Sequence, residues 1–218
     1  MVDDTRVLRQ FEAAPLRALR LRDVKDDDKA NTWRTIERLV DRGALRKLTH
    51  GVYVAPPGGR DAHRWRPTLE AAALAVATAR HGVDDVALTG ISAARHWAAV
   101  PRAIGEATVA VPAAGYAPIT LETGGRVRFV PRDMERLDLI REDTELGRGL
   151  VTTPEQTLFD LLMRKHANLA RDEVDVATRN LAARANPADY QHVLRAAKRV
   201  NQPAKAMLEW LGRDVHVG

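Results

Sequence analysis

The sequence predicts an α+β protein with a winged helix-turn-helix at its N-terminus. A larger C-terminal α+β domain follows, with a small mixed sheet and a helical C-terminal third. Three observations lead to this prediction. A basic amphipathic segment at 29–42 precedes a glycine and a hairpin pattern. The pattern changes after the Pro-Pro-Gly-Gly-Arg stretch at 56–60. Beyond residue 153 the apolar spacing is helical throughout, with Asn-Pro and Gln-Pro breaks.

Composition narrows the classes of protein to which the chain can belong. It has 218 residues, no cysteine, 45% apolar residues and a formal net charge of +5. The absence of cysteine excludes zinc fingers, thiol nucleophiles and disulfide scaffolds. Because the sequence has neither a signal-peptide pattern nor an apolar run of membrane-spanning length, we expect a soluble, cytoplasmic protein with no membrane partner.

The elements before residue 29 are short. Residues 5–13 predict a helix, because their apolar side chains fall on one face. The run at 15–24 predicts either a second helix or a short strand. Three acidic residues at 26–28 follow, where Asp is a good N-cap and suits the helix dipole. They mark the beginning of the next helix.

The helix at 29–42 is the most informative element of the N-terminal part. Its expected apolar face consists of Trp33, Ile36, Leu39 and Val40. Gly43 ends the helix. The apolar and alternating runs at 44–48 and 51–55 then predict two strands of a hairpin, with Thr49, His50 and Gly51 at the turn.

The same region concentrates the positive charge. Between residues 29 and 47, six basic residues stand against two acidic ones, so most of the net charge lies here. The major groove admits one α-helix, whose first turns reach base edges. The predicted DNA-binding residues are Lys29, Asn31, Thr32, Arg34, Thr35, Arg38, Arg42, Arg46, Lys47, Thr49 and His50.

The members of this set suit different contacts. Asn31, Arg34 and Thr35 suit base edges, whereas Arg38 and Arg42, further along the helix, suit phosphates. The hairpin tip at 47–50 suits the DNA backbone or the minor groove. The alternative is an amphipathic helix whose arginines lie on a solvated face.

The stretch at 56–60 is the expected linker. It divides the chain into a DNA-binding domain at 1–58 and a partner-binding domain at 59–218. The second domain begins with an alanine-rich helix at 65–80, a strand at 86–89 and a helix after it. Further strands are expected at 107–111, 119–121, 126–130 and 137–141. Helices are expected from 153 to 166 and near 172–184, 187–200 and 203–212.

Three stretches are similar to one known family. Residues 38–56 (RLVDRGALRKLTHGVYVAP), 88–100 (LTGISAARHWAAV) and 151–164 (VTTPEQTLFDLLMR) resemble AbiEi-type antitoxins of the type IV AbiE toxin–antitoxin systems. The resemblance implies a sequence-specific autorepressor that binds inverted repeats in its promoter, with room for more than one protomer per operator. It also implies a cognate nucleotidyltransferase toxin encoded next door. The family's DNA-facing positions fall on Asn31, Arg34, Thr35 and Arg38, with the wing at 47–51. It places no toxin-contacting residue.

An enzymatic interpretation depends on Ser92. The run at 90–94 follows a strand and opens a helix, as in the GxSxG nucleophile elbow, but Ala94 replaces the second glycine. We expect Ser92 or Thr89 to cap the helix instead, and we expect no enzyme activity. Because the seven histidines lack metal-ligand spacing, neither a metal nor a cofactor is expected.

Two alternatives remain open at this stage. A second basic patch consists of Arg195, Lys198, Arg199 and Lys205. It fits a solvated face, a second surface for the DNA backbone, or a contact with an acidic toxin. The alternative function for the whole chain is a one-component winged-helix transcriptional regulator, in which the C-terminal domain senses a small ligand.

Overall fold

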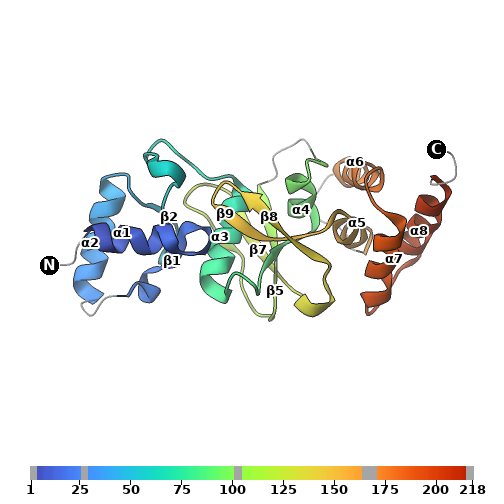
Figure 1. Ribbon diagram of the computed structural model, residues 1–218, viewed down its shortest axis with the longest axis horizontal. Coiled ribbons are helices and arrows are strands. Elements are labelled where there is room, and N and C mark those ends of the chain that lie inside the picture. Colours follow the sequence, from blue (N-terminus) through green and yellow to red (C-terminus); the bar gives the residue numbers. More distant parts are fainter. Residues whose placement is uncertain (1–3, 26–28, 101–104, 164–170, 215–218) are drawn as a thin grey trace.

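The computed structural model describes residues 4–25, 29–100, 105–163 and 171–214. Short helices and a small sheet lie at one end, a six-stranded sheet lies in the middle, and the C-terminal helices lie at the other end (Figure 1). The α+β class and the mixed sheet predicted from the sequence are confirmed. No helix within the described ranges is long and apolar enough to cross a membrane.

The N-terminal part packs two helices against a three-stranded sheet. Helix α1 (Asp4–Ala13) contacts α2 (Lys29–Asp41). The strands β1 (Ala18–Arg20), β2 (Arg46–Thr49) and β3 (Val52–Val54) are antiparallel, in the order β1-β3-β2. Side chains that include Val7, Phe11, Ile36 and Leu39 form the hydrophobic cluster between them.

The connections in this part follow from local chemistry. The run at 15–24 contains β1 flanked by two 3₁₀ turns, Pro15–Arg17 and Leu21–Asp23, so it holds the short strand rather than a second α-helix. The predicted helix that ends before Gly43 and the predicted hairpin are both present. Gly43 (φ 71°) and Gly51 (φ 68°) both have positive φ values, which favour glycine. The acidic run at 26–28, predicted to cap α2, lies outside the described residues.

The central sheet is mixed, with the strand order β6-β7-β5-β4-β9-β8. Its strands are β4 (Ala87–Leu88), β5 (Glu106–Val111), β6 (Ile119–Thr120), β7 (Arg126–Pro131), β8 (Leu139–Thr144) and β9 (Gly147–Thr152). The pairs β5–β7 and β4–β9 are parallel, and the other neighbours are antiparallel. Strand β9 was not predicted, because its glycines and arginine interrupt the apolar pattern.

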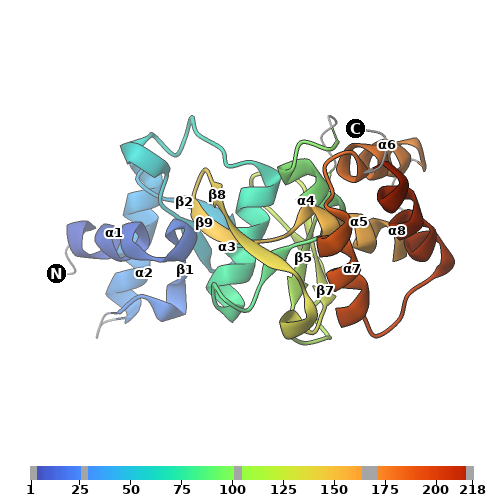
Figure 2. The ribbon, with the colours of Figure 1, turned by 45° about the vertical axis from the view of Figure 1, so that its right-hand side comes forward.

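Helix α3 (Leu69–His81) lies between the two sheets (Figure 2). The Thr68 hydroxyl accepts a hydrogen bond from the Ala71 N–H (3.3 Å) and caps it. Its residues 71–78 are all buried, and most are alanine, whose small side chain allows close packing. Leu48, Val52 and Val54 of the hairpin belong to the same hydrophobic cluster as α3 and the central strands. The division of the chain at residues 58 and 59 stays a prediction.

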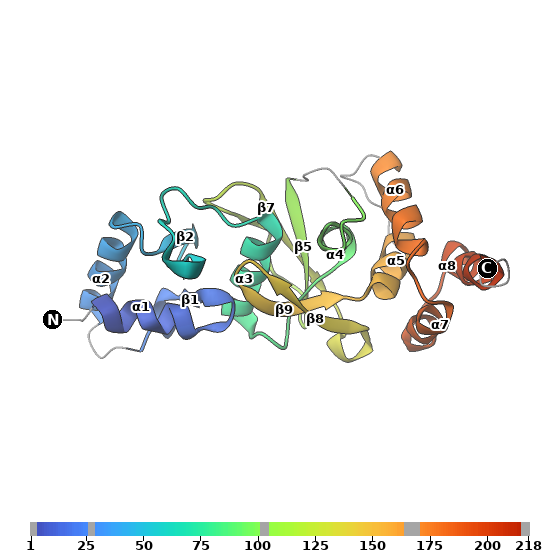
Figure 3. The same ribbon diagram turned by 45° about the horizontal axis from the view of Figure 1, so that its top comes forward.

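The C-terminal third is helical, as predicted. Helix α4 (Gly90–His96) packs against α5 (Pro154–Met163), and α6 (Arg171–Ala182), α7 (Pro187–Ala196) and α8 (Gln202–Asp214) complete this end (Figure 3). The buried Tyr190 hydroxyl donates to the Ala204 carbonyl (3.1 Å) and joins α7 to α8. The Asn186 side chain caps α7, where the Asn-Pro break predicted a boundary.

Candidate nucleic-acid interface

The orientation of α2 decides which of the predicted residues are exposed. Its buried stripe consists of Thr32, Thr35, Ile36 and Leu39, which are between 0% and 4% exposed. Trp33, predicted to belong to the apolar face, is 48% exposed. The stripe therefore keeps helical spacing but uses two threonines in place of the tryptophan. Because Thr32 and Thr35 are buried, the structure corrects their prediction as DNA contacts: neither side chain is presented to a base.

The exposed side of α2, together with the residue that follows the helix, carries a row of arginines. Arg34, Arg38 and Arg42 follow at intervals of four, which places them along one side of the helix. Arg34 is exposed, and Asn31 is partly exposed. Lys29 begins α2, but its side chain lies outside the described part of the structure.

A carboxylate from α1 already contacts two of these arginines. The Asp4 oxygens accept from Arg38 Nη2 (2.7 Å) and from Arg42 Nη1 (2.9 Å). Arg38 also donates to the buried Thr35 hydroxyl (3.0 Å). The hydrogen bond from Arg38, together with the positive charges of Arg38 and Arg42, holds the pKa of Asp4 below its ordinary value against the opposing effect of burial. Asp4 thus neutralises part of the row.

Three of the predicted hairpin residues bind other parts of the chain. Arg46 donates to the Ala62 and His63 carbonyls, and its burial lowers its pKa. Lys47 Nζ lies 3.2 Å from the Glu122 carboxylate. Thr49 is 7% exposed, and its hydroxyl donates to the Thr120 carbonyl (3.3 Å). His50, at the tip, is exposed.

These contacts change the interpretation of the hairpin. Arg46, Lys47 and Thr49 fasten it to segments near residues 62 and 120–122, so within the structure they hold the hairpin in place. No sequence pattern indicated these partners, which lie between 16 and 75 residues away in the chain.

The second basic patch lies at the opposite end from α2 (Figures 1 and 2). It consists of the exposed side chains of Arg195, Lys198, Arg199 and Lys205. Lys198 and Arg199 line a groove of about 300 Å³ together with Arg132 and Arg136. Lys198 Nζ lies 3.4 Å from the Asp133 carboxylate. The structure therefore does not bring this patch to the arginine row of α2.

A buried polar cluster joins the central sheet to α5, and sequence reasoning missed its centre. The Asp160 carboxylate is 3% exposed and accepts from Thr89 (2.7 Å), Arg132 (2.9 Å) and Gln156 (3.1 Å). Two polar residues four apart, Gln156 and Asp160, on one face of a helix whose second half is otherwise apolar were the available signal.

The two hydroxyls proposed as helix caps have other roles. Thr89 occupies the N-cap position of α4 but donates to Asp160 instead of capping. Ser92 is buried, and its oxygen accepts from the Thr108 N–H (2.8 Å), so it is not presented as a nucleophile elbow requires. The prediction that either one caps the helix was wrong. Among the described residues, no three His, Asp or Glu side chains gather as metal ligands.

Comparisons with known proteins find one family model for the C-terminal part of the chain and a similar fold for most of its length. A family model described as the AbiEi antitoxin C-terminal domain matches residues 70–210. The solved structure of the RV2827C protein from Mycobacterium tuberculosis is similar, with a TM-score of 0.60 and 19% sequence identity over 95% of this chain and 75% of that chain. At this identity the likeness shows a shared fold. A comparison with curated proteins gives no match.

Proposed function

This chain belongs to the AbiEi antitoxin family, and we propose that it is a sequence-specific DNA-binding antitoxin that represses its own operon. In this proposal, residues 1–58 form a winged helix-turn-helix that binds inverted repeats in the promoter, with α2 as the recognition helix. Residues 59–218 counteract a cognate nucleotidyltransferase toxin. Family membership supports the antitoxin role, and the N-terminal geometry supports the DNA-binding role.

One observation carries the DNA-binding proposal: α2 is packed on one side and presents an arginine row on the other, next to a glycine-turned hairpin. An exposed helix of this kind fits the major groove. We assign base readout to Arg34, which is free of the Asp4 contact. We assign phosphate contacts to Arg38 and Arg42, since a phosphate can replace the Asp4 carboxylate.

The hairpin supports this assignment in a way that the sequence did not indicate. His50 at its tip is the exposed candidate for a backbone or minor-groove contact. Arg46, Lys47 and Thr49 have a positioning role in this proposal, because their bonds to the rest of the chain fix the angle between the hairpin tip and α2.

The test is DNA binding by fluorescence anisotropy, with the protein's own upstream promoter and a scrambled duplex, across a salt series. We expect tighter binding to the promoter and a steep fall with salt, because phosphate contacts release counterions. Arg34→Ala should cost about 1–3 kcal/mol on the promoter and relax specificity at one position. The matched control is Arg179→Ala, an exposed arginine on α6.

The outcomes distinguish base readout by Arg34 from a phosphate contact by Arg34. Equal, weak binding to both duplexes would overturn sequence-specific recognition. If Arg34→Ala weakened both duplexes equally, Arg34 would be a phosphate contact. The antitoxin role is tested separately, by growth of cells that express the neighbouring nucleotidyltransferase gene with this protein or with its Arg34→Ala variant. Loss of DNA binding with retained rescue would assign neutralisation to the C-terminal part.

A further inference from the structure

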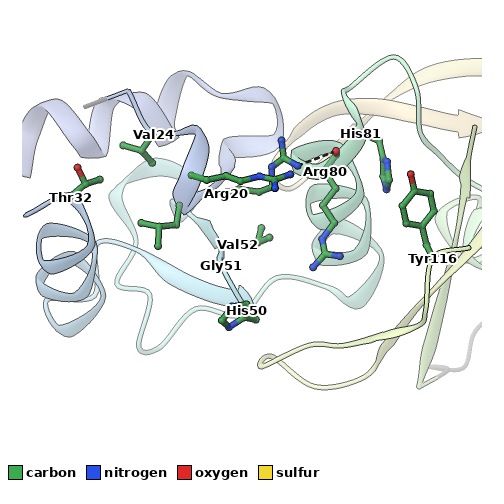
Figure 4. Close-up of a pocket in the computed structure, with 11 residues that line it drawn as sticks. Arg20, Val24, Thr32, His50, Gly51, Val52, Arg80, His81 and Tyr116 are labelled. Carbon is green, nitrogen blue, oxygen red and sulfur yellow. Dashed lines mark hydrogen bonds between the residues drawn. The ribbon is translucent and has the colours of Figure 1, made fainter. Parts of the chain in front are cut away.

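A cleft of about 690 Å³ lies between the N-terminal sheet and the C-terminal end of α3. Figure 4 shows its walls: Thr32 and Val24 on one side, His50 below, and Arg80, His81 and Tyr116 on the other. The volume falls in the range of small-molecule sites, roughly 300–1,000 Å³. The cleft belongs neither to the exposed arginine row of α2 nor to the C-terminal basic patch.

Three arginines supply the charge of this cleft. Arg20 is held by two bonds to the Asp23 carboxylate and by a bond from its Nη1 to the Arg80 carbonyl (3.4 Å). Within the described part of the chain, the guanidinium groups of Arg22 and Arg80 have no carboxylate partner. Burial, and next the positive charges of Arg20 and Arg22, lower the pKa of Arg80. A cluster of like charges in a cleft is complemented by an anion.

The other walls are aromatic and apolar. Tyr116 is 42% exposed, and its ring meets the His81 ring edge-on, with centroids 4.5 Å apart. His81 Nε2 is buried and has no hydrogen-bond partner. The side chain of Val52 forms an apolar floor, and Val24 makes the adjoining wall apolar. An exposed aromatic ring in a cleft suits a planar group that can stack on it.

We propose that this cleft binds a nucleotide, with its phosphates against Arg22 and Arg80 and its base against Tyr116. The three kinds of lining group meet the three parts of such a ligand: guanidinium forks bind phosphate, an aromatic face stacks on the base, and the apolar floor excludes water. A duplex is the less suitable occupant, because a backbone phosphate reaches an exposed convex surface more easily than a recess with an apolar floor.

The test is isothermal titration calorimetry of the full chain with ADP, GDP, CDP and UDP, and with pyrophosphate and the matching nucleosides. We expect at least one nucleoside diphosphate to bind more tightly than pyrophosphate or its own nucleoside. Arg22→Ala and Tyr116→Ala change exposed side chains and should each weaken binding by about tenfold. Arg80→Ala should do the same, and Arg179→Ala, outside the cleft, should leave binding unchanged. Melting temperatures check that each variant is folded.

Several results would overturn the proposal. One is the absence of heat with every nucleotide at millimolar concentration. Another is nucleotide binding that persists in folded Arg22→Ala and Tyr116→Ala. A third is loss of promoter binding in Arg22→Ala without any nucleotide binding to the parent protein, which would assign the cluster to the DNA backbone. Because the titration contains no DNA, failure here leaves the proposed repressor function to its own test.

Discussion

The contact between Asp4 and the arginine row of α2 leads to a prediction in which stability and DNA affinity move in opposite directions. In Asp4→Asn the side chain keeps its shape but loses its charge. Arg38 and Arg42, at 2.7 and 2.9 Å, then lose their carboxylate partner. The net charge of this group of three side chains rises by one, and both guanidinium groups become available to phosphate.

The stability cost can be worked from the contacts. Both arginines are well exposed, so each ion pair contributes roughly 0.2–1 kcal/mol. Asp4 also stands in the first turn of α1, where a negative charge contributes roughly 0.3–1 kcal/mol through the helix dipole. The total loss is about 1–3 kcal/mol. For a chain of this size it lowers the melting temperature by roughly 2–12 °C.

The Asp4→Asn substitution should at the same time raise the affinity for DNA. On the proposed function, removing a competing carboxylate gains up to about 1 kcal/mol, or about fivefold in affinity. The salt dependence should steepen by about one unit if one more phosphate is neutralised. The assays are anisotropy with the promoter duplex and thermal melting of the free protein. Glu12→Gln is the control, since Glu12 lies on the same helix but pairs with Arg17 (3.5 Å). A variant that is less stable and binds DNA no better would refute the idea that Asp4 competes with phosphate.

Three further predictions concern stability. The pKa of Asp4 is lowered in the folded state, so its contribution is complete above its ordinary value of 3.8 and is lost as pH falls through the folded value. Urea unfolding should therefore show a constant difference in the free energy of unfolding between the parent and Asp4→Asn from neutral pH to about pH 4. Below that pH the difference should shrink. A difference that widens on acidification would contradict the lowered pKa. Asp160→Ala leaves Arg132, 18% exposed, without its partner and should cost about 3–5 kcal/mol in urea unfolding; a loss below about 1 kcal/mol would mean that the pair is dispensable. Tyr190→Phe removes the bond to the Ala204 carbonyl and should cost about 1 kcal/mol, and unchanged unfolding would show that water replaces the hydroxyl.

The sequence allowed the order of elements to be predicted where periodicity is strong. The hairpin at 46–54 and the helices of the C-terminal third were predicted because apolar spacing and Asn-Pro or glycine punctuation agree there. The β9 strand was missed, because Gly147, Arg148 and Gly149 in its first half interrupt the apolar pattern by which a strand is predicted.

The candidate site was only partly predictable. The arginine row on α2 follows from spacing alone. The burial of Thr32 and Thr35 does not, because threonine is polar enough to be expected outside and Trp33 apolar enough to be expected inside. The partners of Arg46 and Lys47, and the meeting of Arg22 with Arg80, depend on contacts between segments far apart in the chain. Contacts of this kind produce no repeating pattern of residues in a single sequence, so they cannot be predicted from periodicity.

On the proposed function, the attachment of the hairpin to the central sheet has a geometric consequence for the choice of operator. Leu48 and Val54 share a core with α3, and the Thr49 hydroxyl donates to the Thr120 carbonyl. The N-terminal part that carries α2 is therefore fixed in orientation relative to the central sheet. Two protomers that touch each other on one promoter would then present their α2 helices at a set separation and a set rotation. Inserting one base pair between the repeats turns one half-site by about a tenth of a helical turn relative to the other. The length of the spacer between the repeats would thus help to determine which promoters are bound. A promoter with the correct repeats but a different spacer length would not be repressed.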